Sequence, residues 1–358
     1  MAGASLAAEL AGSCSVIVLE GEAQPGYHAT GRSAAFWSET YGGKLIQPLT
    51  TASRAWLANP PTEYNETGFL SPRGEINIGI RADREVLETF RDAFTHSTVS
   101  TEWCNRDAIA RRCDFLKPEW DCGIAVPSCA DIDVARLHQA YLRRAKQLGA
   151  TLRCNAALQT AARSGSSWRI ATSFGEIEAD VLVNAAGAWV DVVARLAGAK
   201  PLGIRAYRRT MLQVRLDREV PDDLPLIIDI KGGFYFKPDR GGLWLSPHDE
   251  TPSPACDVAP DELDVAIAVD RFERAATARV ISVTRRWAGL RSFAPDRLPV
   301  YGDDPQTPGL FWFAGQGGFG IQTAPAAAKL AAALLLGQSP EVSLSGIDPA
   351  RYAPDRLI

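Results

Sequence analysis

Two residues near the start of the chain are spaced as in a nucleotide-binding unit. Gly3 opens a run of small helix formers (residues 3–11), and Glu20 ends a short apolar run (residues 15–19). A helix, an apolar strand and then an acid form the second half of a βαβ unit, in which the glycine lets the helix pack closely on its strand and the acid hydrogen-bonds a ribose. The pair alone is weak evidence, because a helix-terminal glycine and a surface glutamate give the same pattern.

The complete fingerprint of such a unit is G-x-G-x-x-G after a buried strand, since a side chain at the middle glycine would keep a pyrophosphate away from the helix N-terminus. With Gly3 as the last glycine, the middle glycine would fall immediately before Met1. We therefore expect the chain as written to lack the first strand of this unit, and we interpret this as a misplaced start or a truncated gene model. The alternative is a non-catalytic chain that holds no cofactor.

Arg291 is a second residue that requires a chemical partner. It lies in the apolar segment WAGLRSF (residues 287–293), where an unpaired charge would be costly. The planar guanidinium fork binds a carboxylate through two parallel hydrogen bonds. The partner is then a carboxylate of this protein or the carboxylate of a substrate.

Composition excludes several classes of function. A net charge of −4 and a pI near 5.7 argue against nucleic-acid binding, which needs a concentrated basic surface. Seven cysteines without a CxxC pair, and four histidines without ligand spacing, predict reduced packing cysteines and no metal site. The start has no basic signal-peptide region, and the longest apolar stretch (residues 324–336) is interrupted by Lys329. We expect a cytoplasmic protein with no transmembrane segment, and leave peripheral contact with the inner membrane open.

Two kinds of strand pattern interleave along the chain. Helices are predicted over residues 44–57, 84–95, 132–148 and 261–277, a hairpin over 67–80, a meander over 151–182 and an antiparallel sheet over 205–250. Asp131 or Asp133 is the expected cap of the third helix, and Gly149 its stop. The chain ends with a strand, a Gly-rich loop and an alanine-rich helix up to Gly337. With βα units at both ends and in the middle, one lobe must be assembled from discontinuous pieces.

Eight motifs carry a resemblance to a known family. They are GYHATGRSAA (26–35), LSPRGE (70–75), DIDVARLHQAYLR (131–143), VLVNAAGAWVD (181–191), PLGIRAYRR (201–209), FYFKPD (234–239), RWAGLRSFAPD (286–296) and GQGGFGIQT (315–323). In this order they resemble the D-amino-acid oxidase family of FAD-dependent oxidoreductases, and most closely its D-arginine dehydrogenases. The resemblance implies an α/β fold in which a Rossmann-like FAD-binding domain, with its first strand missing, interleaves with an α+β substrate domain built on an antiparallel sheet. We expect residues 1–66, 130–203 and 284–358 in the FAD-binding domain, and residues 67–129 and 204–283 in the substrate domain.

The resemblance also implies a set of flavin contacts. Glu20 would hold the adenosine ribose, the segment around Thr30 would follow the pyrophosphate and flavin, and the turn at Gly187 would face the adenine side. The loop at Gly318 would lie at the pyrimidine edge of the flavin, where a helix N-terminus stabilises the negative charge of the reduced ring. The expected cofactor residues are Gly3, Glu20, His28, Thr30, Gly31, Arg32, Ser33, Ala185, Ala186, Gly187, Trp189, Gly317, Gly318, Gly320, Ile321, Gln322 and Thr323.

The implied substrate residues surround a carboxylate and a side chain. Arg209 and Arg291 match the two arginines that clamp a substrate carboxylate, and Tyr41 and Tyr235 match phenols that reach the same group. Glu75 matches the acid that pairs with the distal cation of D-arginine or D-lysine, although an exposed strand-edge glutamate is its plain alternative. Together with Gly318, these residues form the expected catalytic set.

The chain departs from the arginine-type members of the family near the flavin. Phe36 followed by Trp37 stands where those members carry a histidine, and Ser38 replaces a threonine. A more apolar wall would shift preference toward hydrophobic D-amino acids. Because neither family attachment position (residues 36–37 and 314–315) offers a His or Cys, we expect non-covalent FAD.

The implied reaction is hydride transfer from the substrate Cα to flavin N5, followed by hydrolysis of the imino acid to a 2-oxo acid and ammonia. No side-chain general base is needed, and the sequence offers no candidate histidine for that role beside these motifs. The resemblance leans toward a dehydrogenase, with oxygen or a quinone as the open choice of electron acceptor. Rival activities on the same fold are an N-methyl amino-acid or glycine oxidase and a 2-hydroxy-acid dehydrogenase.

Overall fold

The first helix and the first strand form where small helix formers are followed by β-branched residues. In the computed structural model, which describes all 358 residues, helix α1 covers Ala2–Leu10 and strand β1 covers Ile17–Leu19. Strand β1 pairs in parallel with β8 (Thr151–Arg153). This is the helix–strand–acid arrangement expected from the sequence, with Glu20 directly after β1.

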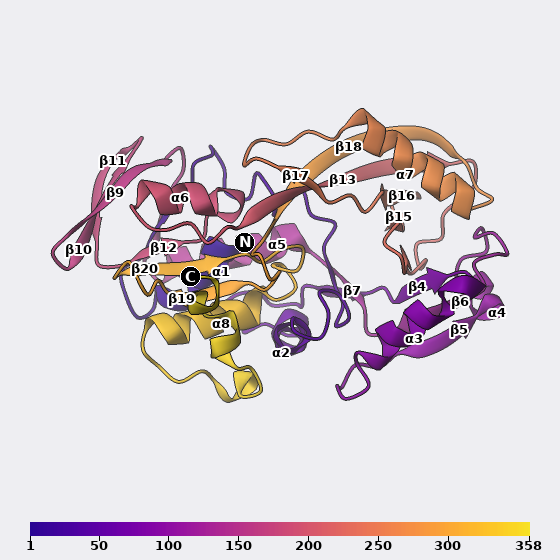
Figure 1. The fold of residues 1–358 in the computed structure, drawn as a ribbon, viewed down its shortest axis with the longest axis horizontal. Helices are drawn as coiled ribbons and strands as arrows, with labels where there is room; N and C mark the ends of the chain where they lie inside the picture. The colour runs from indigo at the N-terminus through magenta and orange to yellow at the C-terminus, as the bar shows by residue number, and fades with distance from the viewer.

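Short parallel strands form the lobe that contains both chain ends (Figure 1). Strand β12 (Leu182–Asn184) pairs in parallel with β20 (Leu310–Ala314), which pairs on its other edge with β19 (Val300–Asp303). This sheet is separate from β1–β8, and no strand of the chain pairs with both. Helices α1, α5 (Val134–Gln147) and α8 (Ala324–Leu335) pack together.

Further elements complete this lobe. The meander consists of β9 (Leu158–Ser164), β10 (Ser167–Thr172) and β11 (Gly175–Ala179). Helices α2 (Gln47–Ala58) and α6 (Val190–Leu196) also belong to it. Apolar side chains from α8, β19 and β20 pack with Leu6 and Leu10 of α1 in one core, so the alanine-rich helix supplies much of what holds α1 in place.

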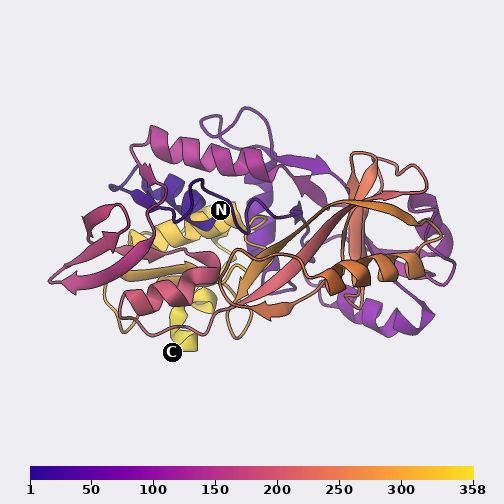
Figure 2. The same cartoon turned by 90° about the horizontal axis from the view of Figure 1, so that it is seen from above.

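A nine-stranded sheet forms the second lobe, which Figure 2 shows beside the first. Its strands are β4 (Glu75–Gly79), β5 (Glu102–Asn105), β6 (Cys122–Val126), β13 (Arg205–Leu216), β14 (Leu226–Asp229), β15 (Tyr235–Asp239), β16 (Gly242–Ser246), β17 (Thr251–Ser253) and β18 (Val280–Phe293). Helices α3 (Arg84–Asp92), α4 (Arg106–Arg112) and α7 (Glu262–Ala275) accompany it. A core of 24 residues, which includes Phe115, Phe236 and Phe272, lies on this sheet.

A small third sheet links the two lobes. Strand β7 (Ala130–Ile132) pairs with β2 (Phe36–Trp37) on one side and with β3 (Leu70–Pro72) on the other. From β7, Asp131 accepts hydrogen bonds from Arg73 Nε at 2.7 Å and from Lys237 Nζ of β15 at 2.6 Å. Ladder hydrogen bonds and a partly buried ion network therefore join the lobes at the same place.

The α/β fold expected from the sequence is confirmed, with one local correction. The predicted hairpin over residues 67–80 is wrong, because β3 pairs with β7 while β4 pairs with β6 and β14. The turn at Gly74 instead passes the chain from the linking sheet to the large sheet. The expected domain boundary at residue 284 falls inside β18, because one continuous 14-residue strand carries the chain from the second lobe to the first.

The helix expectations differ from the structure only at their ends. Helix α3 ends at Asp92 rather than at residue 95, and α2 begins three residues later than expected. Asp133, one of the two expected caps, accepts a hydrogen bond from the backbone N–H of Arg136 at the start of α5. Gly149, just beyond that helix, has φ +96°, a conformation that favours glycine and ends the helix.

Replacing Asp131 with asparagine tests the ionic link between the lobes. The Lys237 side chain is 9% exposed, so loss of its counter-charge should lower the free energy of unfolding by about 3 kcal/mol. Asp270→Asn, which breaks the exposed pair with Arg274 on α7, should change it by less than about 0.5 kcal/mol. Urea unfolding measures both, and equal effects of the two variants would contradict a buried link.

Candidate functional site

Segments far apart in the sequence meet at the N-terminus of α1. The Met1 nitrogen donates to Thr30 Oγ1 at 2.8 Å, and a Cβ on Gly3 would lie 3.8 Å from Ala185 Cβ, just after β12. Helix α1 has no side-chain cap and no acid in its first turn. Its first N–H groups are therefore available to an anion, as the expected pyrophosphate contact requires.

The turn after β12 lies against the segment of His28. The rings of His28 and Trp189 are 4.6 Å apart, and His28 Nε2 is 2.8 Å from Glu22 Oε1. Gly187 has φ +57°, and a Cβ built there would meet no atom within 4 Å. Ala186 and Gly187 thus leave open space where the sequence predicts the adenine side of the cofactor.

Arg32 and Gln322 are also held by protein partners, as His28 and Thr30 are. The Arg32 guanidinium binds Asp257 and the carbonyl oxygens of Val258 and Ala288, so only its backbone is free to face a cofactor. Gln322, which is 1% exposed, accepts from the Ser38 N–H and donates to Tyr41 O and Thr50 Oγ1. Its side chain positions the segment that carries Tyr41.

The Gly-rich loop before α8 passes close to the expected substrate residues. A Cβ on Gly318 would lie 2.2 Å from Tyr41 Oη and 2.6 Å from Arg291 Nη1, so a side chain there would displace the ends of both groups. Residues 318–323 form turns, and Thr323 is the N-cap of α8 without a side-chain cap bond. The loop therefore brings the N-terminal end of α8 near the phenol and guanidinium of the site, although the Ala324 and Ala326 N–H groups already donate to Ile321 O and Ser53 Oγ.

A cavity of about 200 Å³ brings most of the expected substrate residues together. Glu75, Arg209, Tyr41, Tyr235 and Phe36 line it, although they come from four separate segments. Arg291 is not among the lining residues, but its Nη1 donates to Tyr41 Oη at 2.7 Å. The remaining lining residues are Thr40, Gly42, Asn77, Phe90, Ile228, Asp229, Ile230, Gly232 and His248.

Glu75 is a buried carboxyl group at this cavity rather than an exposed strand edge. It is 2% exposed, and its Oε1 accepts from Asn77 Nδ2 at 2.7 Å and from Thr40 Oγ1 at 3.3 Å. Its Oε2 is buried and accepts no hydrogen bond of ordinary length and angle, although the side chains of Ser38 and Cys129 also lie against the carboxyl group. Burial raises the pKa of Glu75 above its ordinary value of 4.5, against the opposite effect of its hydrogen bonds. A donor or a cation in the cavity would satisfy the free oxygen.

Adjacent antiparallel strands hold the two arginines close to each other. Arg209 of β13 is paired with Gly289, and Arg291 of β18 is paired with Tyr207. The arginines are therefore diagonal neighbours on one face of the sheet, about 7–8 Å apart at their Cα atoms. Arg209 is 6% exposed and its Nη2 has no hydrogen-bond partner. Burial, followed by the nearby charge of Arg291, lowers the pKa of Arg209.

A carboxylate of the protein also reaches these arginines. Glu250 forms a short ion pair with Arg291 Nη2, and its Oε1 lies 3.5 Å from Arg209 Nη2. Both Glu250 oxygens also accept from Arg297, at 3.0 and 2.9 Å. Of the two partners that the sequence left open for Arg291, the protein carboxylate is present in the structure.

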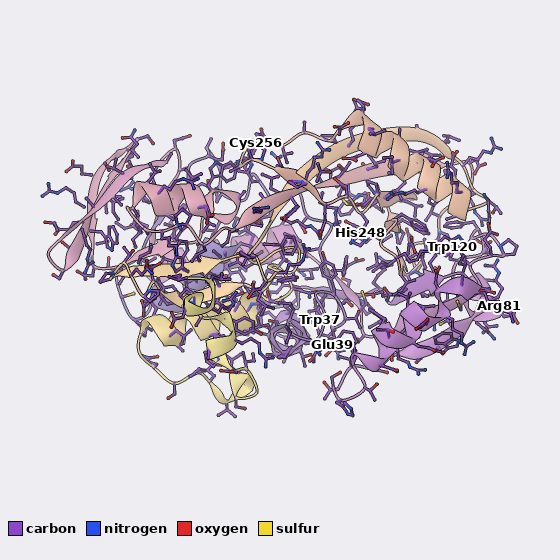
Figure 3. All side chains as sticks on the ribbon, in the orientation of Figure 1. Trp37, Glu39, Arg81, Trp120, His248 and Cys256 are labelled. Carbon is purple, nitrogen blue, oxygen red and sulfur yellow. The ribbon has the colours of Figure 1, made fainter.

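His248 is the functional candidate that sequence reasoning missed. The expectation of no histidine beside the site was wrong, because the chain returns from β16 and places His248 edge-on against Tyr235, with ring centroids 5.4 Å apart. In the view of Figure 3, His248 lies in the central part of the molecule. Burial, and then the charges of Arg209 and Arg291, lower its pKa to about 3. His248 is thus a neutral imidazole in the cavity wall at neutral pH.

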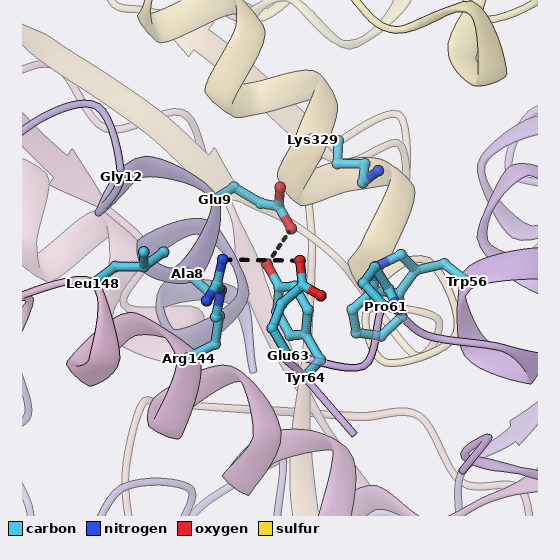
Figure 4. Close-up of a pocket in the computed structure, with 10 residues that line it drawn as sticks. All are labelled: Ala8, Glu9, Gly12, Trp56, Pro61, Glu63, Tyr64, Arg144, Leu148 and Lys329. Atoms are coloured by element: carbon cyan, nitrogen blue, oxygen red, sulfur yellow. Dashed lines mark hydrogen bonds and ion pairs between the residues drawn. The ribbon is translucent and has the colours of Figure 1, made fainter. Parts of the chain in front are cut away.

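A second cavity, of about 290 Å³, lies away from these residues (Figure 4). Helices α1, α2, α5 and α8 contribute to it, and Tyr64 donates to Glu9 at its centre. None of its lining residues belongs to the expected cofactor or substrate sets. We therefore take the cavity between Glu75 and Arg209 as the candidate active site.

Known structures similar to this one define the class of fold. Glycine oxidase from Geobacillus kaustophilus superposes with a TM-score of 0.85 at 21% identity, over 99% of this chain and 96% of that one. L-proline dehydrogenase from P. horikoshii gives 0.84 at 20% identity, over 99% and 94%. This likeness shows the fold of the FAD-dependent amine and amino-acid oxidoreductases.

The sequence shows the family itself. The family described as FAD dependent oxidoreductase (DAO) matches residues 1–334, and the chain belongs to it. Glycine oxidase of Pseudomonas aeruginosa is 33% identical over 193 residues, which are 52% of this chain and 48% of that protein. Mitochondrial dimethylglycine dehydrogenase of Homo sapiens is 25% identical over 253 residues, which are 64% of this chain and 29% of that protein. The chain thus spans less than half of these two relatives.

FAD is the cofactor of this family, and the residues present fit it. The uncapped start of α1 and the open space at Gly187 are the features that a pyrophosphate and an adenosine need in turn. Other features add little to the assignment. All seven cysteines are free, no group of three acidic, His or Cys side chains is arranged for a metal, and no helix is both long and apolar enough to cross a bilayer.

Replacing Glu75 with glutamine tests the raised pKa. Because the folded-state pKa exceeds that of the unfolded chain, the protonated group contributes its stability fully below about pH 4.5 and loses it as the pH rises through the folded value. Glu75→Gln removes this loss. The free energy of unfolding of the variant relative to wild type should therefore rise by about 1.4 kcal/mol per pH unit between the two pKa values.

Urea unfolding from pH 4 to 8 measures this difference. Glu262→Gln, at an exposed pair with Arg286, is the matched control and should show no such trend. Parallel pH profiles of wild type and Glu75→Gln would show that Glu75 titrates normally.

Proposed function

We propose that the chain oxidises a D-amino acid with FAD, and that its substrate has a cationic side chain such as that of arginine or lysine. The observation that carries this proposal is a buried carboxyl group with a free oxygen, Glu75 Oε2, lining the same cavity as a buried arginine with a free Nη2, Arg209. A molecule with a carboxylate at one end and a donor at the other would satisfy both groups.

The residues at the arginine end would hold and orient the substrate carboxylate. Arg209 and Arg291 supply charge, and Tyr41 and Tyr235 bring phenol groups to the same place. Tyr41 Oη already accepts from Arg291, which leaves its own proton free to bind a carboxylate oxygen. Such a clamp supports oxidation by fixing Cα relative to the cofactor before reaction.

The residues at the Glu75 end would select the side chain. Without substrate, the raised pKa favours the neutral carboxylic acid. A guanidinium or ammonium at Oε2 favours ionisation of Glu75, so binding of a cationic substrate should release a proton. Phe36, Phe90 and Ile228 would pack on the aliphatic part of that side chain and exclude water.

The amine must be neutral for its lone pair to assist loss of hydride from Cα. Bound FAD supplies the redox chemistry by accepting that hydride at N5. The positive charge of Arg209 in the cavity favours deprotonation of the amine, because a like charge disfavours the ammonium form, and His248 stays neutral down to a pH of about 3. The imino acid that leaves the cavity would be hydrolysed by water to a 2-oxo acid and ammonia.

A glycine or N-methyl amino-acid oxidase is the second candidate. The similarity to glycine oxidase and dimethylglycine dehydrogenase favours it. Such small substrates would bind the arginine end alone and leave Glu75 Oε2 without a partner. Such substrates therefore explain the arginine end of the cavity but not the buried Glu75.

The test is reduction of the bound flavin under anaerobic conditions. D-arginine should bleach the visible flavin absorbance, while L-arginine should not. Glu75→Gln should lower kcat/KM for D-arginine about a hundredfold, because an uncompensated cation is left in the cavity. For D-methionine, whose side chain is of similar length and uncharged, kcat/KM should change little in the same variant. D-methionine therefore serves as the matched control substrate.

Other outcomes separate the candidates. Bleaching by glycine or sarcosine but not by D-arginine would establish the second candidate. An equal fall in kcat/KM for D-arginine and D-methionine in Glu75→Gln would mean that Glu75 has a structural role.

A further inference from the structure

The segment from Pro247 to Glu250 places a carboxylate on the arginine pair. Glu250 contacts Nη2 of both arginines, in a short ion pair with Arg291 and at 3.5 Å from Arg209. The Arg209 contact is too long for a hydrogen bond, and Arg209 Nη2 remains buried without a partner. Glu250 therefore neutralises the pair but satisfies only one of its two arginines.

The geometry of this segment is suited to movement. His248 has φ +59°, a left-handed and strained conformation that non-glycine residues rarely adopt. Glu250 is followed by β17, a three-residue strand that pairs only with β13 at the margin of the sheet. The Glu250 side chain is 35% exposed, whereas those of Arg209 and Arg291 are 7% and 13% exposed. Glu250 can thus reach solvent without unfolding the strands that hold the arginines.

Arg297 is a further partner of Glu250. Both Glu250 oxygens accept from one nitrogen of Arg297, Nη2, and the Arg297 side chain is 51% exposed. A Glu250 that leaves Arg291 can keep this contact at the surface. Its departure would therefore not leave an unpaired carboxylate.

We propose that Glu250 is an internal competitor for the anion site at Arg209 and Arg291, and that a ligand carboxylate binds by displacing it. This inference rests on the proposed function, in which the two arginines bind a substrate carboxylate. Glu250 then sets substrate affinity: it keeps the buried arginines neutralised in the free enzyme, and each substrate must exchange with it. The ligands that displace Glu250 are those whose carboxylate hydrogen-bonds to both arginines at once.

Replacement of Glu250 with glutamine removes the competing charge and keeps the side-chain volume. In the FAD-bound protein, the Kd of benzoate should fall about fivefold, since a partly exposed ion pair is worth up to about 1 kcal/mol. Benzamide has the same shape but no charge, and its affinity should not change. Isothermal titration calorimetry measures both without catalysis. With a substrate, KM should fall by a similar factor while kcat stays the same.

Two further variants separate competition from structure. Glu250→Asp keeps the charge on a side chain one methylene shorter and should give an intermediate benzoate Kd. Glu262→Gln breaks an arginine pair elsewhere in the same lobe and should leave the benzoate Kd unchanged. These comparisons hold even if Glu250→Gln folds poorly, because the aspartate variant preserves the charge.

The possible failures are distinct. An unchanged or weakened benzoate affinity in both Glu250 variants, with clear binding by wild type, would overturn the competitor role and leave the proposed function intact. Absence of benzoate binding in wild type and variants alike would overturn both, because the arginine pair would then not be a carboxylate site.

Discussion

The buried arginine pair is the constraint on which the site depends. Two cations held on adjacent strands repel each other, and burial removes the water that would screen them. The register of β13 against β18 fixes them on one face of the sheet. The surrounding residues compensate: Asp249 lies 3.8 Å from Arg209 Nε, Glu250 contacts both arginines, and Tyr41 accepts from Arg291. An anion is the ligand that such a site favours most.

The same two strands connect the site to the rest of the fold. β13 and β18 are the long strands of the sheet, and they extend from the second lobe toward the first (Figure 1). Near the end of β18, Ser292 O accepts from the Gly317 N–H, which places the Gly-rich loop directly against Arg291. A side chain at Gly318 would collide with both Tyr41 and Arg291. The loop that starts α8 and the strand that carries the arginine are therefore built to fit each other.

Local patterns in the sequence were enough to predict the helices other than α4 and the strand periods, whereas the site residues followed from the resemblance to the family. Glu75 and Arg209 were identified from motifs more than a hundred residues apart, and the structure places both at one cavity. Pairing partners could not be predicted in the same way. The Pro72–Gly74 turn has the composition of a hairpin, but whether β3 and β4 pair with each other depends on where β6, β7 and β14 lie.

His248 and Glu250 were missed for a related reason. Neither belongs to a motif, and their roles arise because the chain leaves β16 in a left-handed turn next to Tyr235 and the arginines. The one signal in the sequence was energetic. An arginine within the apolar segment around Arg291 requires an anionic partner, which could be a carboxylate of the protein or of a substrate. Only the three-dimensional arrangement shows that a protein carboxylate meets this requirement.

The cavity is electrically asymmetric, and this asymmetry limits what can bind. At one end the positive charges are fixed, because the guanidinium groups remain protonated at any working pH. At the other end burial raises the pKa of Glu75, and a nearby cation would lower it again. Under the proposed function, a zwitterionic substrate with a second cation would gain twice: its carboxylate would meet charge that is already present, and its side chain would favour the charge that it needs on Glu75. A substrate without the distal cation would gain only the first contribution, so the Glu75 end would discriminate between substrates.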